Sequence, residues 1–285
     1  MIDINYYMTG ELQKKPVVYN IETTNECQMK CDYCPGSTLM TRPLDLMQMW
    51  LFERIVEQIE PWSDSQWERW ESFALWKYDV PESEVSEDNF FLYVIPKVIT
   101  LHGFGEPLLD PYIADRVDTL SEAGIPSYLS THVYDMGVIE KLFEAGLDYL
   151  KFSLYSEKIR DVVKMRDKGG YATQIILSLV GGIAHEIKGV YSYGKSQDQV
   201  WYKDSKPVKS IHWAEPCKFP WSSMTIQANG DVVACNSDYN SELVMGNIET
   251  ESLWNIWNGD KYRHLREHQG RYERCVKRCD RNISI

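Results

Sequence analysis

The chain has 285 residues, 44% of them hydrophobic and 25% charged, so it has enough apolar material for a folded core and is unlike a disordered or small disulfide-stapled protein. Its 30 basic and 42 acidic residues give a net charge of −12, which disfavours binding to nucleic acid or to anionic membrane surfaces. No stretch resembles a membrane span or a signal peptide, so we predict a cytoplasmic protein with no membrane partner.

Short strands and helical patterns alternate along the first two thirds of the chain. A β-branched run predicts a strand at 17–22, and apolar residues spaced as one helical face predict a helix over 46–59. Further strands are predicted at 98–103, 126–130, 148–154 and 173–181, with a weak sixth at 206–213, and the helices between them end at Gly124 and Gly146. This alternation predicts an α/β fold of five or six strand–helix units, fewer than the eight of a closed barrel.

Two segments depart from this alternation. Residues 61–90 carry four tryptophans and eight acids against two bases, and we interpret them as a surface helical insertion, with a lid or docking surface as the alternative. The Asn229-Gly230 pair between two apolar runs predicts a β-hairpin. We therefore divide the chain into an N-terminal extension at 1–16, a strand–helix domain at 17–213 and a small C-terminal module at 214–285.

The cysteines form two groups, one early and one late in the chain. The early group is Cys27, Cys31 and Cys34, and the late group is Cys217, Cys235, Cys275 and Cys279. In a reducing compartment such grouping indicates metal ligation rather than disulfides. The early group supplies three thiolates on a loop after a strand and has no fourth ligand nearby. This favours a [4Fe–4S] cluster with one open iron over a structural zinc site.

Two motifs carry a family resemblance. The spacing Cys27-x-x-x-Cys31-x-x-Cys34, with Tyr33 before the last cysteine, resembles the signature of the radical S-adenosylmethionine (radical SAM) superfamily. The segment Gly103-Phe104-Gly105-Glu106-Pro107 after the second strand resembles that family's GGEP motif, with an ordinary strand–helix loop as the alternative. The resemblance implies a partial (β/α)6 TIM-like barrel in which the early cysteines hold the cluster that binds SAM. Glycines let the backbone approach a ligand, and the Glu106 carboxylate can accept a hydrogen bond from the SAM ammonium.

Further cofactor contacts follow from the resemblance. Ser130, Thr131 and Ser153 lie where the family places polar residues near the SAM ribose, although the asparagine and glycine usual there are missing. Arg166 lies where related enzymes place an arginine that faces SAM or substrate, and we assign it a catalytic role. The alternatives are a strand serine bonded to the backbone for Ser153 and a solvated helix arginine for Arg166.

The late cysteines, with the hairpin between the first two and a helical segment expected over 246–262, resemble the auxiliary-cluster module called Twitch, a shortened SPASM domain. The resemblance implies one auxiliary [4Fe–4S] cluster held by Cys217, Cys235, Cys275 and Cys279. Zinc is the alternative, because four thiolates also suit a tetrahedral zinc ion.

The expected activity also follows from the resemblance, in which a 5′-deoxyadenosyl radical formed from SAM abstracts a hydrogen atom from substrate. If all seven cysteines bind clusters, none remains to return a hydrogen atom, and a fully ligated second cluster suits an electron acceptor. We therefore expect a dehydrogenase-like oxidation of a small polar, sugar- or aminocyclitol-like metabolite, with a flavodoxin or ferredoxin as electron donor. The main alternative is a peptide-modifying epimerase or crosslink-forming maturase. A non-enzymatic metal-binding adaptor would leave Gly105-Glu106-Pro107 unexplained.

Overall fold

The computed structural model describes residues 17–32, 34–66, 68, 98–180, 187–195 and 219–268. The chain divides into two compact units, the first made of Met1–Gln58, Gly103–Glu106 and Asp198–Ile285, the second of Ile59–His102 and Pro107–Gln197. These units are drawn differently from the predicted domains, since the C-terminal residues group with the N-terminal ones. The extension at 1–16, most of the insertion at 61–90 and the strand at 206–213 lie outside the described residues, and their predictions stay open.

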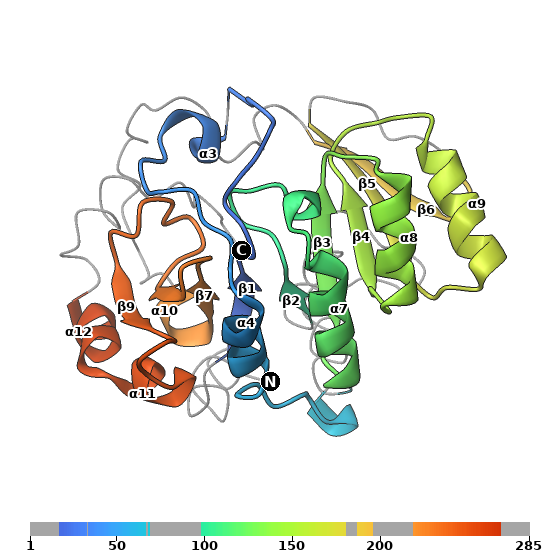
Figure 1. Cartoon of the computed structure of the whole chain (residues 1–285). Coiled ribbons are helices and arrows are strands. Elements are labelled where there is room, and N and C mark those ends of the chain that lie inside the picture. Colours follow the sequence, from blue (N-terminus) through green and yellow to red (C-terminus); the bar gives the residue numbers. More distant parts are fainter. Residues whose placement is uncertain are drawn as a thin grey trace, which may run out of the picture. The chain divides into compact units, whose positions relative to one another are not determined.

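The second unit contains a parallel sheet with strands in the order β2, β3, β4, β5 and β6. The strands are β2 (Ile99–Thr100), β3 (Ser127–Thr131), β4 (Tyr149–Phe152), β5 (Gln174–Val180) and β6 (Val190–Lys195). Helical elements between them are η1 (Pro107–Leu109), α7 (Ile113–Glu122), α8 (Met136–Glu144) and α9 (Ile159–Gly169). Figure 1 shows α7, α8 and α9 side by side on one face of this sheet.

The two faces of this sheet differ in chemistry because side chains alternate along each strand. In the register of the sheet, Leu129, Leu150 and Ile175 form a buried apolar row across β3, β4 and β5. Ser130 and Lys151 pair one position further along and therefore point to the opposite face. The helices present buried apolar side chains and lie on one side (Figure 1), so they cover the apolar row. The polar row faces away from the helices.

The first unit contains β1 (Val18–Ile21), β7 (Met224–Ile226), β8 (Asp231–Val233) and β9 (Val244–Asn247), paired in that order. β1 and β7 are parallel, whereas β7, β8 and β9 pair antiparallel. The helices are α3 (Pro35–Thr38), α4 (Met49–Val56), α10 (Phe219–Ser222), α11 (Leu253–Asn258) and α12 (Asp260–His268). Among the described helices of the chain, none has the length and apolar character needed to cross a membrane.

The predicted hairpin is confirmed, and Gly230 in its turn has a φ of 82°, a conformation that favours glycine. The prediction of a helical segment over 246–262 is wrong for its first residues. Gly246 and Asn247 belong to β9, and the helix begins only at Leu253, where Ser252 accepts a hydrogen bond from Asn255 N at 3.1 Å. β9 and β6 are thus two strands that the sequence analysis does not predict.

A buried ion pair fixes the start of α7 in the second unit. Arg116 Nε donates to Asp110 Oδ2 at 2.7 Å, and both side chains are 0% exposed. Asp110 Oδ1 also accepts from Tyr112 N at 2.9 Å, so the carboxylate holds both the helix and the turn before it. A buried charge is tolerated when such a partner compensates it.

Asp110→Ala is expected to lower the free energy of unfolding by about 3 to 5 kcal/mol, because the Arg116 guanidinium stays buried without its carboxylate. Urea denaturation followed by tryptophan fluorescence measures this loss. Glu157→Ala is the control, since it removes one partner of an ion pair with Arg160 whose side chains are 74% and 57% exposed. That variant is expected to change stability by less than about 1 kcal/mol. Equal losses in the two variants would contradict the assignment.

Candidate cluster and cofactor site

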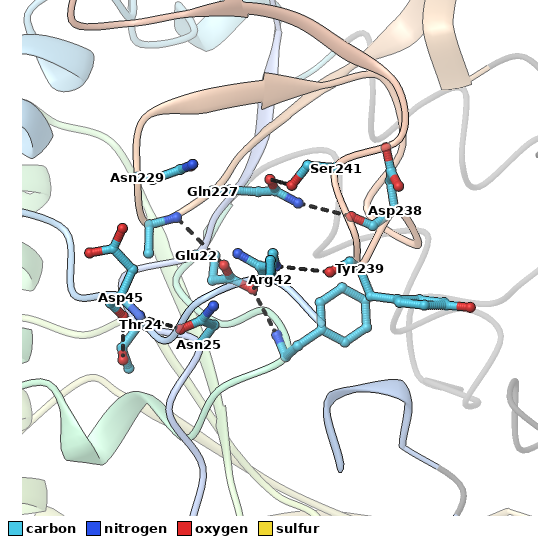
Figure 2. Close-up of polar contacts among 12 residues, drawn as sticks. Glu22, Thr24, Asn25, Arg42, Asp45, Gln227, Asn229, Asp238, Tyr239 and Ser241 are labelled. Carbon is cyan, nitrogen blue, oxygen red and sulfur yellow. Dashed lines mark hydrogen bonds and ion pairs between the residues drawn. The ribbon is translucent and has the colours of Figure 1, made fainter. Parts of the chain in front are cut away.

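The loop with the early cysteines follows β1 and leads into α3. Its base is fixed by two buried side chains that bond to the segment before α4 (Figure 2). Thr24 Oγ1 donates to the Asp45 carbonyl at 3.0 Å, and Asn25 Oδ1 accepts from Asp45 N at 2.6 Å. Asn25 Nδ2 also donates to the Pro43 carbonyl at 2.8 Å. Both ends of this stretch of chain are therefore anchored.

The thiols of Cys27, Cys31 and Cys34 are partly exposed and form no disulfide. Burial raises the pKa of Cys27 and of Cys34, and the negative charges of Glu106 and of the other two thiols raise that of Cys27 further. Three thiols near one another fit the donor set of a cluster with an open iron. Within the described residues, no three ligating side chains converge closely enough to hold a metal ion as they stand. Binding a cluster requires these thiols to lose their protons.

The segment Gly103–Glu106 packs directly on this loop because two of its residues lack a side chain. A Cβ atom on Gly103 would lie 2.5 Å from Glu22 Oε2, and one on Gly105 would lie 2.2 Å from the Thr24 carbonyl oxygen. Glu106 N donates to the Glu26 carbonyl at 2.8 Å, and Glu106 is 1% exposed. The structure thus brings together the two motifs that are far apart in the sequence, with the Glu106 carboxylate near Cys27.

Gly105→Ala is expected to lower the free energy of unfolding by more than about 2 kcal/mol and to abolish SAM binding, because the new methyl group meets backbone that cannot yield. Thermal unfolding and equilibrium dialysis with SAM measure the two effects. Gly137→Ala is the control, since its Cβ would lie 3.5 Å from its nearest neighbour, Asp135 Oδ1, an ordinary contact. Normal SAM binding by the Gly105 variant would show that the close approach is not required.

A second group of polar residues lies at the carboxyl ends of strands in the second unit. Ser130 N donates to His102 Nδ1 at 3.1 Å, and the hydroxyl oxygens of Ser130 and Ser153 are 3.3 Å apart. Burial, with smaller contributions from Lys151 and His132, lowers the pKa of His102 to about 3. The imidazole is therefore neutral at pH 7, with its proton on Nε2. Catalytic groups of parallel β/α barrels lie at this end of the strands.

Two predicted residues are not brought to this group. Thr131 points to the opposite face from Ser130, and its buried hydroxyl accepts from Val133 N at 2.9 Å, which shapes the turn after β3. Arg166 lies near the end of α9, where it pairs with Asp167 at 2.6 Å and donates to the Gly189 carbonyl at 2.9 Å. Gly189 precedes β6, so Arg166 lies at the amino end of the sheet. The Arg166 side chain is 15% exposed and held by these two contacts, so it is not a solvated helix arginine either, and its catalytic role stays a prediction.

Cys235 is the one late cysteine within the described residues. It follows β8, its thiol is partly exposed and forms no disulfide, and its Sγ accepts from Ser237 N at 3.4 Å. The other late cysteines and the aromatic residue before Cys34 lie outside the described residues: Tyr33, Cys217, Cys275 and Cys279. Their expected roles stay predictions.

Several residues of these sites are missed by the sequence analysis. Lys151 shares a strand face with Ser153 by the two-residue period of a strand, so alternation could have found it. His102 directly precedes the glycine motif, so its place next to that motif could have drawn attention to it. Glu22 and Arg42, which form an ion pair at 2.6 Å, have no local signal, because only the fold brings them together.

Comparisons with known proteins agree with this geometry. Residues 217–280 match the SPASM family, described as an iron–sulfur cluster-binding domain. The fold resembles the crystal structure of BtrN in complex with AdoMet and 2-DOIA, with a TM-score of 0.61 and 19% identity over 95% of this chain and 96% of that chain. It also resembles Streptococcus suis SuiB bound to precursor peptide SuiA, with a TM-score of 0.54 and 13% identity over 89% of this chain and 67% of that chain. These matches confirm the unclosed α/β fold class.

Together with the sequence match to a curated relative, they make the chain similar to radical SAM enzymes that carry a C-terminal SPASM domain. The curated relative is the S-adenosyl-L-methionine-dependent 2-deoxy-scyllo-inosamine dehydrogenase of Niallia circulans, 22% identical over 93% of this chain and 92% of the relative. The resemblance stated from the two motifs is therefore confirmed.

Proposed function

We propose that this protein is a radical SAM dehydrogenase that oxidises a small polar, sugar- or aminocyclitol-like metabolite. The observation that carries the proposal is the sequence match to a SAM-dependent aminocyclitol dehydrogenase over nearly the full length of both chains. A radical SAM peptide-modifying enzyme is the alternative. It is supported by similarity of fold to SuiB, which this chain matches over two thirds of that protein's length.

We assign the cofactors to this chain's own residues. Cys27, Cys31 and Cys34 hold the cluster that binds SAM, and the buried Glu106 carboxylate binds the SAM ammonium. Gly103 and Gly105 allow the close packing that places this carboxylate. Tyr33, Ser130, Thr131 and Ser153 are the remaining assigned cofactor contacts, and of these Ser130 and Ser153 have the strongest support, since their hydroxyls adjoin on the polar sheet face.

One auxiliary [4Fe–4S] cluster held by Cys217, Cys235, Cys275 and Cys279 completes the proposal. The SPASM match spans all four residues, which supports their assignment as ligands. When bound, the cofactors supply a 5′-deoxyadenosyl radical to remove hydrogen and an acceptor for one electron. A flavodoxin or ferredoxin is the proposed reductant.

The polar sheet face suits a hydroxylated substrate. A polyol needs many hydrogen-bond partners on leaving water, and this face supplies hydroxyl, imidazole and amine groups at neighbouring strand ends. Lys151 and His132 both lie near His102. His132 offers an imidazole that can accept the proton that the substrate loses on oxidation. The Lys151 ammonium, which projects from the strand itself, can stabilise the negative charge left on the substrate oxygen.

The first test separates the two cysteine groups. Cys27→Ala is expected to abolish release of 5′-deoxyadenosine, because two thiols cannot hold the SAM cluster. Cys235→Ala is expected to retain some release but to form no oxidised product. Anaerobic incubation with SAM, dithionite and 2-deoxy-scyllo-inosamine, followed by mass spectrometry, measures both products.

Three outcomes would count against the proposal. Absence of 5′-deoxyadenosine from the wild type would exclude radical SAM chemistry. Full turnover by Cys235→Ala would remove the auxiliary cluster from the reaction. Turnover of peptides in place of aminocyclitols would establish the alternative function.

Lys151→Met is expected to reduce substrate oxidation about a hundredfold while release of 5′-deoxyadenosine persists, because the variant lacks the cation that stabilises the negative charge on the substrate oxygen. The ratio of oxidised product to 5′-deoxyadenosine measures the effect. Lys164→Met is the matched control, since the Lys164 side chain is 77% exposed on α9. A wild-type ratio in Lys151→Met would show that Lys151 takes no part in the oxidation.

A further inference from the structure

The buried Glu22 carboxylate at the end of β1 gathers three segments of the first unit (Figure 2). Its Oε2 atom accepts from Arg42 Nη2 at 2.6 Å and from Phe104 N at 3.1 Å. Its Oε1 atom accepts from Ala228 N at 3.5 Å. The segment after the early cysteines, the glycine motif and the β7–β8 hairpin are therefore all bonded to one carboxylate.

Arg42 continues this connection toward the late cysteine group. Its Nε donates to the Tyr239 carbonyl at 2.8 Å, so one guanidinium bonds both Glu22 and the loop after Cys235 (Figure 2). The Arg42 side chain is 9% exposed, which makes both bonds stronger than they would be at the surface. Arg42 follows Cys34 in the chain as Tyr239 follows Cys235, so the guanidinium joins the segments that follow the two cysteine sites.

Asn240 makes a second connection between the same two segments. Its Oδ1 accepts from Thr41 N at 2.7 Å, and its Nδ2 donates to the Leu39 carbonyl at 3.2 Å. The neighbouring Tyr239 ring packs edge-on against Phe104 of the glycine motif, with ring centroids 5.9 Å apart. Side chains at two successive positions, 239 and 240, thus contact the parts of the chain that follow or face the early cysteines.

The loop after Cys235 is braced internally, so a restraint at 239–240 reaches the cysteine. The buried Asp238 carboxylate accepts from Glu242 N at 3.0 Å and from Leu243 N at 2.8 Å. Asp238 N donates to the Cys235 carbonyl at 3.0 Å. Gln227 Nε2 donates to the Asp238 carbonyl at 2.8 Å, and Ser241 Oγ donates to Gln227 Oε1 at 2.6 Å (Figure 2).

We propose that Arg42 and Asn240 are positioning residues that hold the Cys235 loop against the segment following Cys34, and so keep substrate oxidation coupled to SAM cleavage. This inference rests on the proposed function, in which both cysteine groups serve one reaction. Neither residue is among the cofactor contacts assigned above. Their loss is expected to leave SAM cleavage running while less of it ends in product.

The first test uses cluster-free protein and needs no activity. In Asn240→Ala, hydrogen–deuterium exchange at the Thr41 amide and across 235–243 is expected to rise about tenfold, because Thr41 N loses its acceptor and the loop loses two bonds. Asn240→Asp keeps an oxygen for Thr41 N and is expected to restore slow exchange there. Asn258→Ala is the matched control, since it removes one bond to the Trp254 carbonyl within α11.

The second test uses the cluster-loaded enzyme. In Asn240→Ala and Arg42→Lys, product formed per 5′-deoxyadenosine is expected to fall about tenfold, while the rate of 5′-deoxyadenosine release stays within about twofold of the wild type. Lysine can still pair with Glu22, but it lacks the fork that also reaches Tyr239. The reduction potential of the auxiliary cluster, measured by EPR-monitored titration, is expected to shift in both variants and not in Asn258→Ala.

The outcomes separate this inference from the proposed function. Wild-type exchange and a wild-type product ratio in Asn240→Ala would overturn the positioning role. A wild type that releases no 5′-deoxyadenosine would instead overturn the proposed function, and the exchange measurement would still decide whether Asn240 holds the loop. Faster exchange with an unchanged product ratio would also overturn the inference, because the contact would then be structural only.

Discussion

The organisation of the first unit depends on the burial of one carboxylate, that of Glu22. A carboxylate that is 2% exposed needs donors from the protein, and here they come from a guanidinium and from backbone amides of two other segments. Those segments must therefore approach the end of β1. The same carboxylate also limits which residue can stand at position 103, because a side chain there would occupy the position of the Glu22 carboxylate. The glycine of the motif is thus required by the protein's own packing as well as by any ligand.

The second unit is organised by a different constraint, the unequal faces of its sheet. The helices cover the face with Leu129, Leu150 and Ile175, and burial of such rows contributes about 25 cal/mol per Å² of apolar surface. The opposite face is then left to Ser130, Lys151 and their neighbours. Polar groups on the inner side of an incomplete barrel add little to stability. Their presence at the strand ends is better explained by binding of a polar molecule than by folding.

The fold and the cysteine site could be predicted from sequence to the extent that their signals are local. The strands at 17–22 and 148–154 and the Asn229-Gly230 turn are visible as β-branched runs and turn residues, and the structure has β1, β4 and the hairpin there. β6 and β9 are not predicted because each contains a glycine, which weakens the strand signal in the sequence. The Glu22–Arg42 pair and the Asn240 contacts join residues that are distant in the chain. The sequence around each of these residues contains no pattern that predicts the contact. Arg166 is the converse case, a plausible residue type that the fold places at the amino end of the sheet, away from Ser130 and Ser153.

The pairing of β1 with β7 bears on how the C-terminal module should be regarded. β1 leads into the early cysteine loop, and its parallel neighbour β7 begins the hairpin that ends at Cys235. The loop with the early cysteines leaves β1 and the Cys235 loop leaves β8, and β7 pairs with both strands, so the two loops belong to one small sheet. An appended module joined by a flexible linker would not share a sheet in this way. Because β8 runs antiparallel to β7, it ends beside the start of β7 and away from the end of β1. Strand pairing alone therefore does not hold the Cys235 loop against the segment that follows the early cysteines, and the contacts of Arg42 and Asn240 supply that restraint.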